Sequence, residues 1–266
     1  MKRKVYLKAY SRISVIHPDP DYKSMFSMME ARRMSKLMKR AVAVSADAMS
    51  RSGISSPDAI VTGTGYGCIE NTEIFLKALS GVSGQPPRPT NFMQSTHNTV
   101  GSLVAIRLKC HGYNSTYSHS TVSFESALLD AFLQIQLGDI DTALVGAFEE
   151  STQDFCDMLE KAGNTRARVG EEPSFTAASF ALSSNPVGAI CEIEDVQIFR
   201  QGGLPSFEGT AVSRDEYTGR YGDNLTVSAL GACDAADMIG SGVSGRVILA
   251  NESAGKPSAY IKFAAI

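Results

Sequence analysis

Several features that would identify common classes of protein are missing from this sequence. No run of about 18 apolar residues occurs, so we expect no transmembrane helix and no membrane insertion. The N-terminal segment MKRKVYLKAYSRISVI is basic, but it lacks a continuous apolar stretch and a small-residue cleavage site. It is therefore better interpreted as a first strand than as a signal peptide. The net charge of −3 gives no reason to expect nucleic-acid binding.

The cysteines are few and form no recognisable ligand or disulfide pattern. There are five, an odd number, and no two are arranged as C-x-x-C, so neither a zinc site nor a disulfide framework is supported. We therefore expect no metal, and reduced thiols of the kind found in cytoplasmic proteins. The five are Cys68, Cys110, Cys156, Cys191 and Cys233.

What is present indicates a globular protein. The 266 residues, 43% of them apolar, are enough for one large domain or two fused halves with a sizeable core. The clearest helical spacing runs from Met29 to Met49, and Gly53 follows as a stop signal. One face of this predicted helix carries Met34, Leu37, Met38, Ala41, Val42, Ser45 and Ala48.

Short β-rich runs then alternate with helical segments. Residues 58–62, 113–118 and 142–145 are predicted as strands, and residues 69–79, 99–110 and 122–137 as helices. The Gly/Pro-rich residues 81–90 are predicted as a loop. This alternation favours an α/β fold whose strands are buried on both faces.

The second half is shorter and less regular. Residues 175–183 and 187–198 are predicted as strands that could form a hairpin around Asn185-Pro186. Residues 200–223 are interpreted as a long surface loop, residues 225–239 as a helix, and residues 246–251 and 258–263 as closing strands. The loop residues that could shape an interface are Glu216, Tyr217, Arg220 and Tyr221.

The two halves of the sequence share a weak internal similarity. The triplet Thr121-Val122-Ser123 begins one helix of small residues, and Thr226-Val227-Ser228 begins another. Each helix leads through a Gly-containing turn into a β-rich run. This order of elements indicates a two-fold pseudo-repeat of one α/β unit.

Residues 113–150 read as a strand, a tight junction, a helix of small and apolar residues and a second strand. This pattern resembles the surroundings of the reactive cysteine in β-ketoacyl synthases, thiolase-fold enzymes that condense acyl chains on carrier proteins. The resemblance implies a thiolase-like α/β fold of two related halves, with mixed sheets and helices between the layers. Residues 1–266 would form a single domain, with a better-matched first half (1–160) and a shortened second half (161–266). Other similar segments are Arg33–Leu37, Asn91–Ser95 with Asn98, Leu137–Asp139, Ala143–Glu149 and Leu230–Ala232.

The resemblance also indicates an altered catalytic site. It places Thr121 where the family has its nucleophilic cysteine, and Ser228 at one of the two histidine positions. No histidine follows His119, and the loop that would carry the other histidine is missing. A thiol ionises readily at a helix N-terminus, whereas a threonine hydroxyl needs an adjacent general base. Losing one donor to a developing oxyanion costs about 100- to 1000-fold in rate, so we expect no useful condensation.

The residues around Thr121 allow more than one interpretation. Thr121 can be a structural N-cap instead of a nucleophile. His119 is either a base or a packing or interface residue, and Ser120 and Ser123 are minor alternatives for acylation. Phe124 stands where the family has glycine, and it either fills the core or plugs the substrate tunnel.

Two further motifs have a functional and a structural interpretation. The segment Gly63-Thr64-Gly65-Tyr66-Gly67 has G-x-G-x-G spacing, which does not match a dinucleotide loop, and we expect no cofactor. A basic cluster on the first predicted helix is either a solvated face or a dock for an acidic acyl carrier protein. Its members are Arg32, Arg33, Lys36, Lys39 and Arg40.

Three functional hypotheses follow from the resemblance. The first is a non-condensing subunit, similar to the chain-length-factor partners of bacterial polyketide, fatty-acid or aryl-polyene-type pathways, that pairs with an active synthase and shapes the acyl tunnel. The second is an active acyltransferase or 3-oxoacyl synthase with a Thr or Ser nucleophile. The third is a homodimeric module that binds an acyl chain or a carrier protein. Residues 112–118 resemble the family's dimer-pairing strand, so we expect a dimer, either with a synthase or with a second copy.

Overall fold

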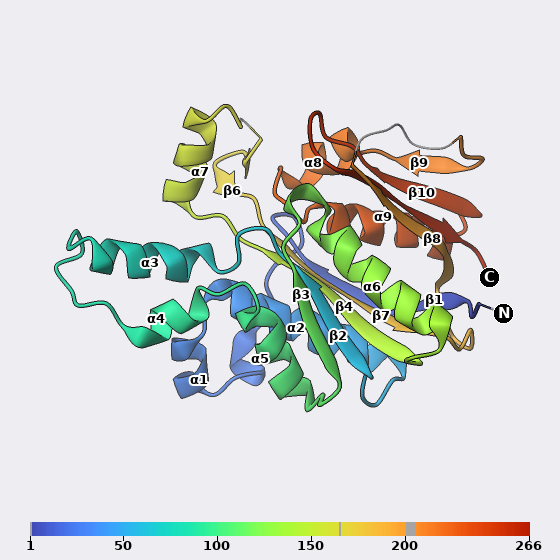
Figure 1. The fold of residues 1–266 in the computed structure, drawn as a ribbon, viewed down its shortest axis with the longest axis horizontal. Helices are drawn as coiled ribbons and strands as arrows, with labels where there is room; N and C mark the ends of the chain where they lie inside the picture. Colours follow the sequence, from blue (N-terminus) through green and yellow to red (C-terminus); the bar gives the residue numbers. More distant parts are fainter. Residues whose placement is uncertain (1, 165, 201–205) are drawn as a thin grey trace.

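The chain folds around a nine-stranded mixed sheet (Figure 1). The structure, a computed structural model, describes residues 2–164, 166–200 and 206–266. The strands lie in the order β3-β2-β4-β7-β1-β8-β11-β10-β9, and β5 pairs with β6 in a separate ribbon. The strands are β1 (Val5–Ile13), β2 (Ala59–Gly63), β3 (Tyr113–Tyr117), β4 (Thr142–Glu149), β5 (Arg168–Val169), β6 (Glu172–Pro173), β7 (Thr176–Ser183), β8 (Cys191–Phe199), β9 (Thr210–Val212), β10 (Arg246–Asn251) and β11 (Ser258–Ala264).

Helices connect these strands and cover the sheet. The α-helices of the described residues are α1 (Met28–Arg33), α2 (Lys36–Ser52), α3 (Ile69–Leu79), α4 (Pro89–Gln94), α5 (Thr99–Leu108), α6 (Ser123–Leu137), α7 (Gln153–Lys161), α8 (Arg214–Tyr221) and α9 (Ser228–Gly240). Short 3₁₀ turns occur at η1 (Tyr22–Ser24) and η2 (Ser120–Val122). None of these helices has the length and apolar character needed to cross a bilayer.

Two hydrophobic cores lie on opposite faces of the sheet. In the first core, α6 packs against β2, β4 and β8, while α9 packs against β10, β11 and β1. In the second core, α2 covers β1, β4 and β7, and α5 covers β2 and β3. Strands β2, β4 and β7 are therefore buried almost throughout. The predicted α/β fold with helices between layers is confirmed.

Strand β1 joins the two parts of the sheet. It pairs antiparallel with β7 on one side and, through three residue pairs from Val5 to Leu7, with β8 on the other. The predicted hairpin between β7 and β8 is therefore wrong, because the N-terminal strand lies between them. The connecting segment crosses the end of β1, where Ile190 N donates to Leu7 O at 2.8 Å.

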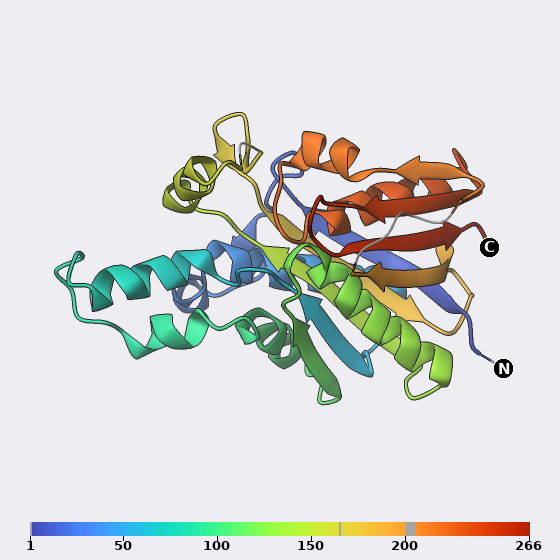
Figure 2. The ribbon, with the colours of Figure 1, turned by 45° about the horizontal axis from the view of Figure 1, so that its top comes forward.

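An arm formed by residues 69–94, which contain α3 and α4, projects away from the sheet (Figures 1 and 2). The rings of Phe75 and Phe92 join its two helices, with their centroids 5.3 Å apart. The arm nevertheless exposes large apolar side chains, among them Leu79 at 63% and Met93 at 67%. Exposed apolar groups gathered on one projecting element are typical of an interaction surface.

The helix predicted over residues 29–49 is interrupted. Ser35 is the N-cap of α2, and its Oγ accepts a hydrogen bond from Met38 N at 3.2 Å. Serine is a favoured N-cap because its hydroxyl satisfies a free backbone N–H group, and this local bond overrides the apolar periodicity. The predicted apolar face is buried from Leu37 onward, and Gly53 ends α2 with φ +71°, as expected.

The surface loop predicted over residues 200–223 is wrong for its described part. This segment contains β9 and α8, while residues 201–205 lie outside the described residues. Tyr217 and Tyr221 are each 1% exposed and belong to the first core, so they do not form a surface interface. Glu216 and Arg220 are exposed as predicted. Helix α7 has no counterpart in the sequence prediction.

Candidate functional site

Thr121 is carried into the interior by a tight turn between β3 and α6. Ser120 has φ +53°, a left-handed conformation uncommon outside glycine. The Ser123 hydroxyl supports this turn by accepting from His119 N at 2.9 Å and donating to Ser120 O at 2.8 Å. Gly63 packs directly against the backbone of this turn. A Cβ atom at position 63 would lie 2.5 Å from Ser123 O, so only glycine allows this close approach. Thr121 is consequently only 1% exposed.

The Thr121 hydroxyl is bonded to the backbone of a neighbouring loop. Its Oγ1 donates to Pro257 O at 3.5 Å, a long bond. The capping positions of η2 and α6 are His119 and Val122, and neither has a side-chain capping bond. The interpretation of Thr121 as an N-cap is therefore wrong.

No imidazole among the described residues is hydrogen-bonded to Thr121. His119 is exposed, and its Nδ1 lies 3.0 Å from Ser126 Oγ. His17 is bonded to Ser14, and His97 to the carbonyl of Gly65. A general base for the Thr121 hydroxyl is thus missing from these contacts.

The other candidate residues of the turn have structural surroundings. Ser120 is exposed, whereas Ser123 is buried and its hydroxyl is used within the turn. Phe124 is fully buried and its ring centroid lies 5.2 Å from that of Phe180. It fills the core between α6 and the sheet.

Ser228 and Glu125 meet where α6 and α9 begin. Ser228 is the first residue of α9 and is 1% exposed. Burial raises the pKa of the Glu125 carboxyl, and the nearby Ser228 hydroxyl and Asn251 amide oppose this shift. No direct hydrogen bond of acceptable geometry reaches Glu125 Oε2 or Ser228 Oγ from the described residues.

Glu125 and Asn251 are site residues that the sequence analysis missed. Asn251 Nδ2 donates at 2.7 Å to both Glu125 Oε1 and Thr121 O. Arg214 Nη1 in turn donates to Asn251 Oδ1 at 2.7 Å. The signal for Glu125 was available, because it is an acidic residue in a helix of mainly small and apolar residues. Asn251 carried no comparable signal.

In the glycine-rich segment 63–67, a side chain of the protein itself binds the backbone N–H groups. Glu149 accepts hydrogen bonds from Gly65 N at 2.5 Å and Tyr66 N at 3.0 Å. Burial raises the pKa of Glu149 to about 8, although these N–H groups oppose the shift. Burial likewise raises the pKa of the adjacent Glu150 to about 7. These N–H groups are therefore not available for a phosphate.

The basic cluster divides into an exposed and a buried part. Arg32, Arg33 and Lys36 are exposed, and Lys39 is half-buried. Arg40 is 5% exposed and forms hydrogen bonds of 2.7 and 2.8 Å to the Asp19 carboxylate. Its guanidinium also lies 3.4 Å from the ring centroid of Phe175. The inclusion of Arg40 in a docking face is therefore wrong, because distant parts of the chain enclose it.

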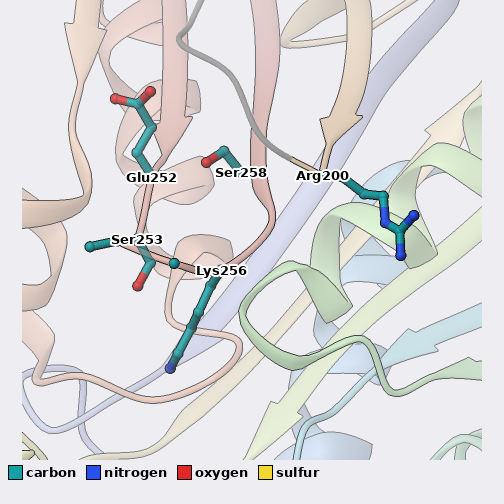
Figure 3. A pocket seen from close by; sticks show the side chains of 7 residues that line it. Arg200, Glu252, Ser253, Lys256 and Ser258 are labelled. Atoms are coloured by element: carbon teal, nitrogen blue, oxygen red, sulfur yellow. The ribbon is translucent and has the colours of Figure 1, made fainter.

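A surface cavity of about 480 Å³ lies on the loop beside Thr121. It is lined by Arg200 and by residues of the loop between β10 and β11, including Glu252, Ser253 and Lys256 (Figure 3). The same loop contains Pro257, the acceptor of the Thr121 hydroxyl. One loop therefore both lines the cavity and contacts the Thr121 hydroxyl.

Burial disfavours the thiolate at four of the five cysteines. All five are free, and four are buried. Burial raises the pKa of Cys68 and of Cys191 to about 12, and it also raises the pKa values of Cys156 and Cys233. Within the described residues, no group of three or more His, Cys, Asp or Glu side chains is arranged to hold a metal.

The sequence matches a known family over most of its length. Residues 11–191 match the family described as the N-terminal domain of β-ketoacyl synthases. The chain therefore belongs to the β-ketoacyl synthase family. It matches no curated protein sequence at a significant level.

Several solved structures share the fold at low sequence identity. An acyl-carrier protein complex with its ketosynthase from a type II polyketide synthase matches with TM-score 0.79 and 17% identity, covering 100% of both chains. A β-ketoacyl synthase from Burkholderia phymatum STM815 matches with TM-score 0.74 and 14% identity, also covering 100% of both. A ketosynthase in complex with its chain length factor from Xenorhabdus doucetiae matches with TM-score 0.64 and 16% identity, covering 99% of this chain and 100% of the other.

Proposed function

We propose that this chain is a non-condensing member of its family that pairs with an active β-ketoacyl synthase and shapes the acyl tunnel. The observation that carries the proposal is the state of Thr121. Its hydroxyl is buried and bonded to a backbone carbonyl, and no imidazole of the described residues is hydrogen-bonded to it. Acyl transfer needs an ionisable nucleophile and a base in contact with it, so this arrangement favours a partner role over catalysis.

The pairing role is supported by the exposed edge of the sheet. β3 is the outermost strand on its side, and its residues are exposed or half-buried. Edge strands expose unpaired backbone groups that favour addition of another strand. Structures with the same fold include a ketosynthase bound to its chain length factor. A chain-length-factor-like role for this chain in polyketide, fatty-acid or aryl-polyene-type synthesis would use this edge.

Carrier-protein docking is the second part of the proposal. Arg32, Arg33 and Lys36 form an exposed basic face on α1 and α2. Acidic carrier proteins would be attracted to such a face by charge complementarity. A structure with the same fold is in complex with an acyl-carrier protein.

Co-expression with the synthase encoded nearest to this chain tests the pairing. We expect co-purification as a one-to-one complex. Tyr113→Lys, on the β3 edge and 44% exposed, should weaken the complex, while the control Val187→Lys, 76% exposed and far from this edge, should not. Absence of a synthase complex, with a homodimer instead, would favour the homodimeric binding module. Acylation of Thr121, Ser120 or Ser123 would favour the acyltransferase.

A further inference from the structure

A small cavity lies between helices α2 and α5, beside the second hydrophobic core. The two helices pack against each other (Figure 1), and the residues that follow η1 complete the lining. The volume of the cavity is about 200 Å³. Its apolar lining comes from Met25, Phe26, Val42, Ala46, Val104 and Leu108.

One charged side chain, that of Arg107 on α5, also lines this cavity. It is 31% exposed, and its guanidinium lies 5.4 Å from the ring centroid of Phe26. Arg107 Nη2 donates a hydrogen bond to Glu30 Oε1 at 2.8 Å. Glu30 is itself held in place, because it completes the capping box of α1 with Ser27. These contacts hold the guanidinium at the edge of the cavity.

Arg107 retains the capacity to bind a second carboxylate. A guanidinium carries five N–H donors in a planar fork, and the described residues accept one hydrogen bond from it, at Glu30. Two parallel N–H groups of arginine match the two oxygens of a carboxylate. Ser45, the other polar residue of the lining, is 1% exposed and its hydroxyl is bonded to Ser179 at 2.9 Å. An anionic group is therefore expected at Arg107, and an apolar group inside the cavity.

The volume limits the size of the apolar group. A cavity of about 150 Å³ lined by aliphatic and aromatic side chains holds one benzene molecule, so the space here accommodates about six to eight carbon atoms. We propose that the cavity binds a small monocarboxylate with an apolar tail of this length, its carboxylate placed on Arg107. The site is separate from the core that contains Phe124, which lies on the opposite face of the sheet. It does not depend on the proposed function.

Titration of the full chain with straight-chain carboxylates from acetate to octanoate tests the proposal. Ligand-observed NMR is suitable because it detects weak binding. Each added methylene group should tighten binding roughly fourfold until the cavity is filled. Hexanol, which has the same tail length but no charge, shows how much the carboxylate contributes. At low salt, hexanoate should bind about tenfold more tightly than hexanol.

Two variants locate the ligand. Ala46→Met places a larger side chain in the cavity and should abolish the binding of both hexanoate and hexanol. Arg107→Met keeps an apolar side chain but removes the charge, so it should weaken hexanoate binding about tenfold and leave hexanol binding unchanged. The control is Arg51→Met, which changes an arginine of α2 that is 52% exposed and paired with Asp47. It should leave both affinities unchanged.

Absence of saturable binding by all of these carboxylates would overturn the proposal. Hexanoate binding that persists in Ala46→Met would overturn it too, because the ligand would then lie elsewhere. Equal hexanoate affinities in the wild type and Arg107→Met would contradict the placement of the carboxylate.

If Ala46→Met does not fold, amide chemical-shift mapping on the wild type decides the question. Hexanoate should shift the amides of residues 42–46 and 104–108, and shifts confined to other segments would overturn the proposal. None of these measurements involves synthase pairing, so failure here leaves the proposed function separately testable.

Discussion

Asn251, the last residue of β10, donates from Nδ2 to Oε1 of Glu125 in the first turn of α6 across 2.7 Å. The same amide nitrogen donates to the Thr121 carbonyl. A side chain from the last part of the sequence therefore fixes the backbone at Thr121, which the resemblance predicts to lie at the nucleophile position. This relationship joins the two halves at the altered site.

Replacing Asn251 by alanine should be destabilising. The change leaves the buried Glu125 carboxylate and the Thr121 carbonyl without their donor, and such losses cost about 1–3 kcal/mol. Urea unfolding of Asn251→Ala would measure the effect. Asn114→Ala is the control, since Asn114 is exposed and donates a 3.3 Å bond to Gly101 O. Equal stability losses in the two variants would contradict this account of Asn251.

Stability should depend on pH through Glu149 and Glu150. Their pKa values of about 8 and about 7 in the folded protein exceed the ordinary value of 4.5. The folded state therefore holds protons that the unfolded state has released, and stability falls as pH rises from about 4.5 to about 8. The slope approaches about 1.4 kcal/mol per pH unit for each carboxyl.

Glu149→Gln separates this contribution from the rest of the protein. The variant cannot ionise at this position, so its stability should change less between pH 7 and pH 8 than that of the wild type. Denaturant unfolding at several pH values would measure both curves, with exposed Glu171→Gln as the control. Parallel curves for wild type and Glu149→Gln would show that Glu149 is already ionised in the folded state.

Arginines in the basic cluster should have two different roles. Arg40→Ala should lower stability by about 2 kcal/mol or more, because it leaves Asp19 without its buried partner and removes the contact with Phe175. Arg32→Ala and Arg33→Ala should change stability by less than about 0.5 kcal/mol. Only these two should weaken acyl-carrier-protein binding, as measured by calorimetry at low salt. Intact carrier binding in an Arg32→Ala/Arg33→Ala double variant would contradict the docking assignment.

Glu149 should also stabilise the backbone that leads into the projecting arm. Its carboxylate binds the N–H groups of Gly65 and Tyr66, only a few residues before α3 begins. Glu149→Ala should speed hydrogen exchange in residues 66–79 by about tenfold or more, since two buried hydrogen bonds from the backbone are lost. Exchange in α9 should change less. Uniform acceleration across the whole chain would indicate global destabilisation instead of a local one.

Local patterns predicted much of the secondary structure. Helix α3 matches its predicted bounds, and strands β2 and β4, which are buried almost throughout, were recognisable as short β-rich runs between helices. The sequence analysis missed the break between α1 and α2 at Ser35. The break depends on the N-cap bond of Ser35, and the apolar spacing is the same whether or not this bond forms. Helix α8 was missed because its glycine and charged residues resemble a loop, while its buried tyrosines depend on contacts with the core.

Non-local contacts explain the remaining errors. The insertion of β1 between β7 and β8 depends on pairing across most of the chain, which no local pattern records. The sequence pattern places Arg40 on a solvated basic face, but in the fold Asp19 and Phe175 enclose its side chain. At the site, the resemblance suggested the role of Thr121, but it could not predict the contacts around it. Thr121 and its acceptor Pro257 are more than a hundred residues apart in sequence, and so are Asn251 and Glu125.

Intact-mass analysis of the co-purified complex after incubation with acyl-carrier thioesters is the most direct test of the central claim. We predict an acyl adduct on the synthase subunit and none on this chain, because no base among the described residues contacts the buried Thr121 hydroxyl. The same result is expected with Thr121→Ala. An acyl adduct on this chain that disappears in Thr121→Ala would contradict the claim that this subunit does not condense.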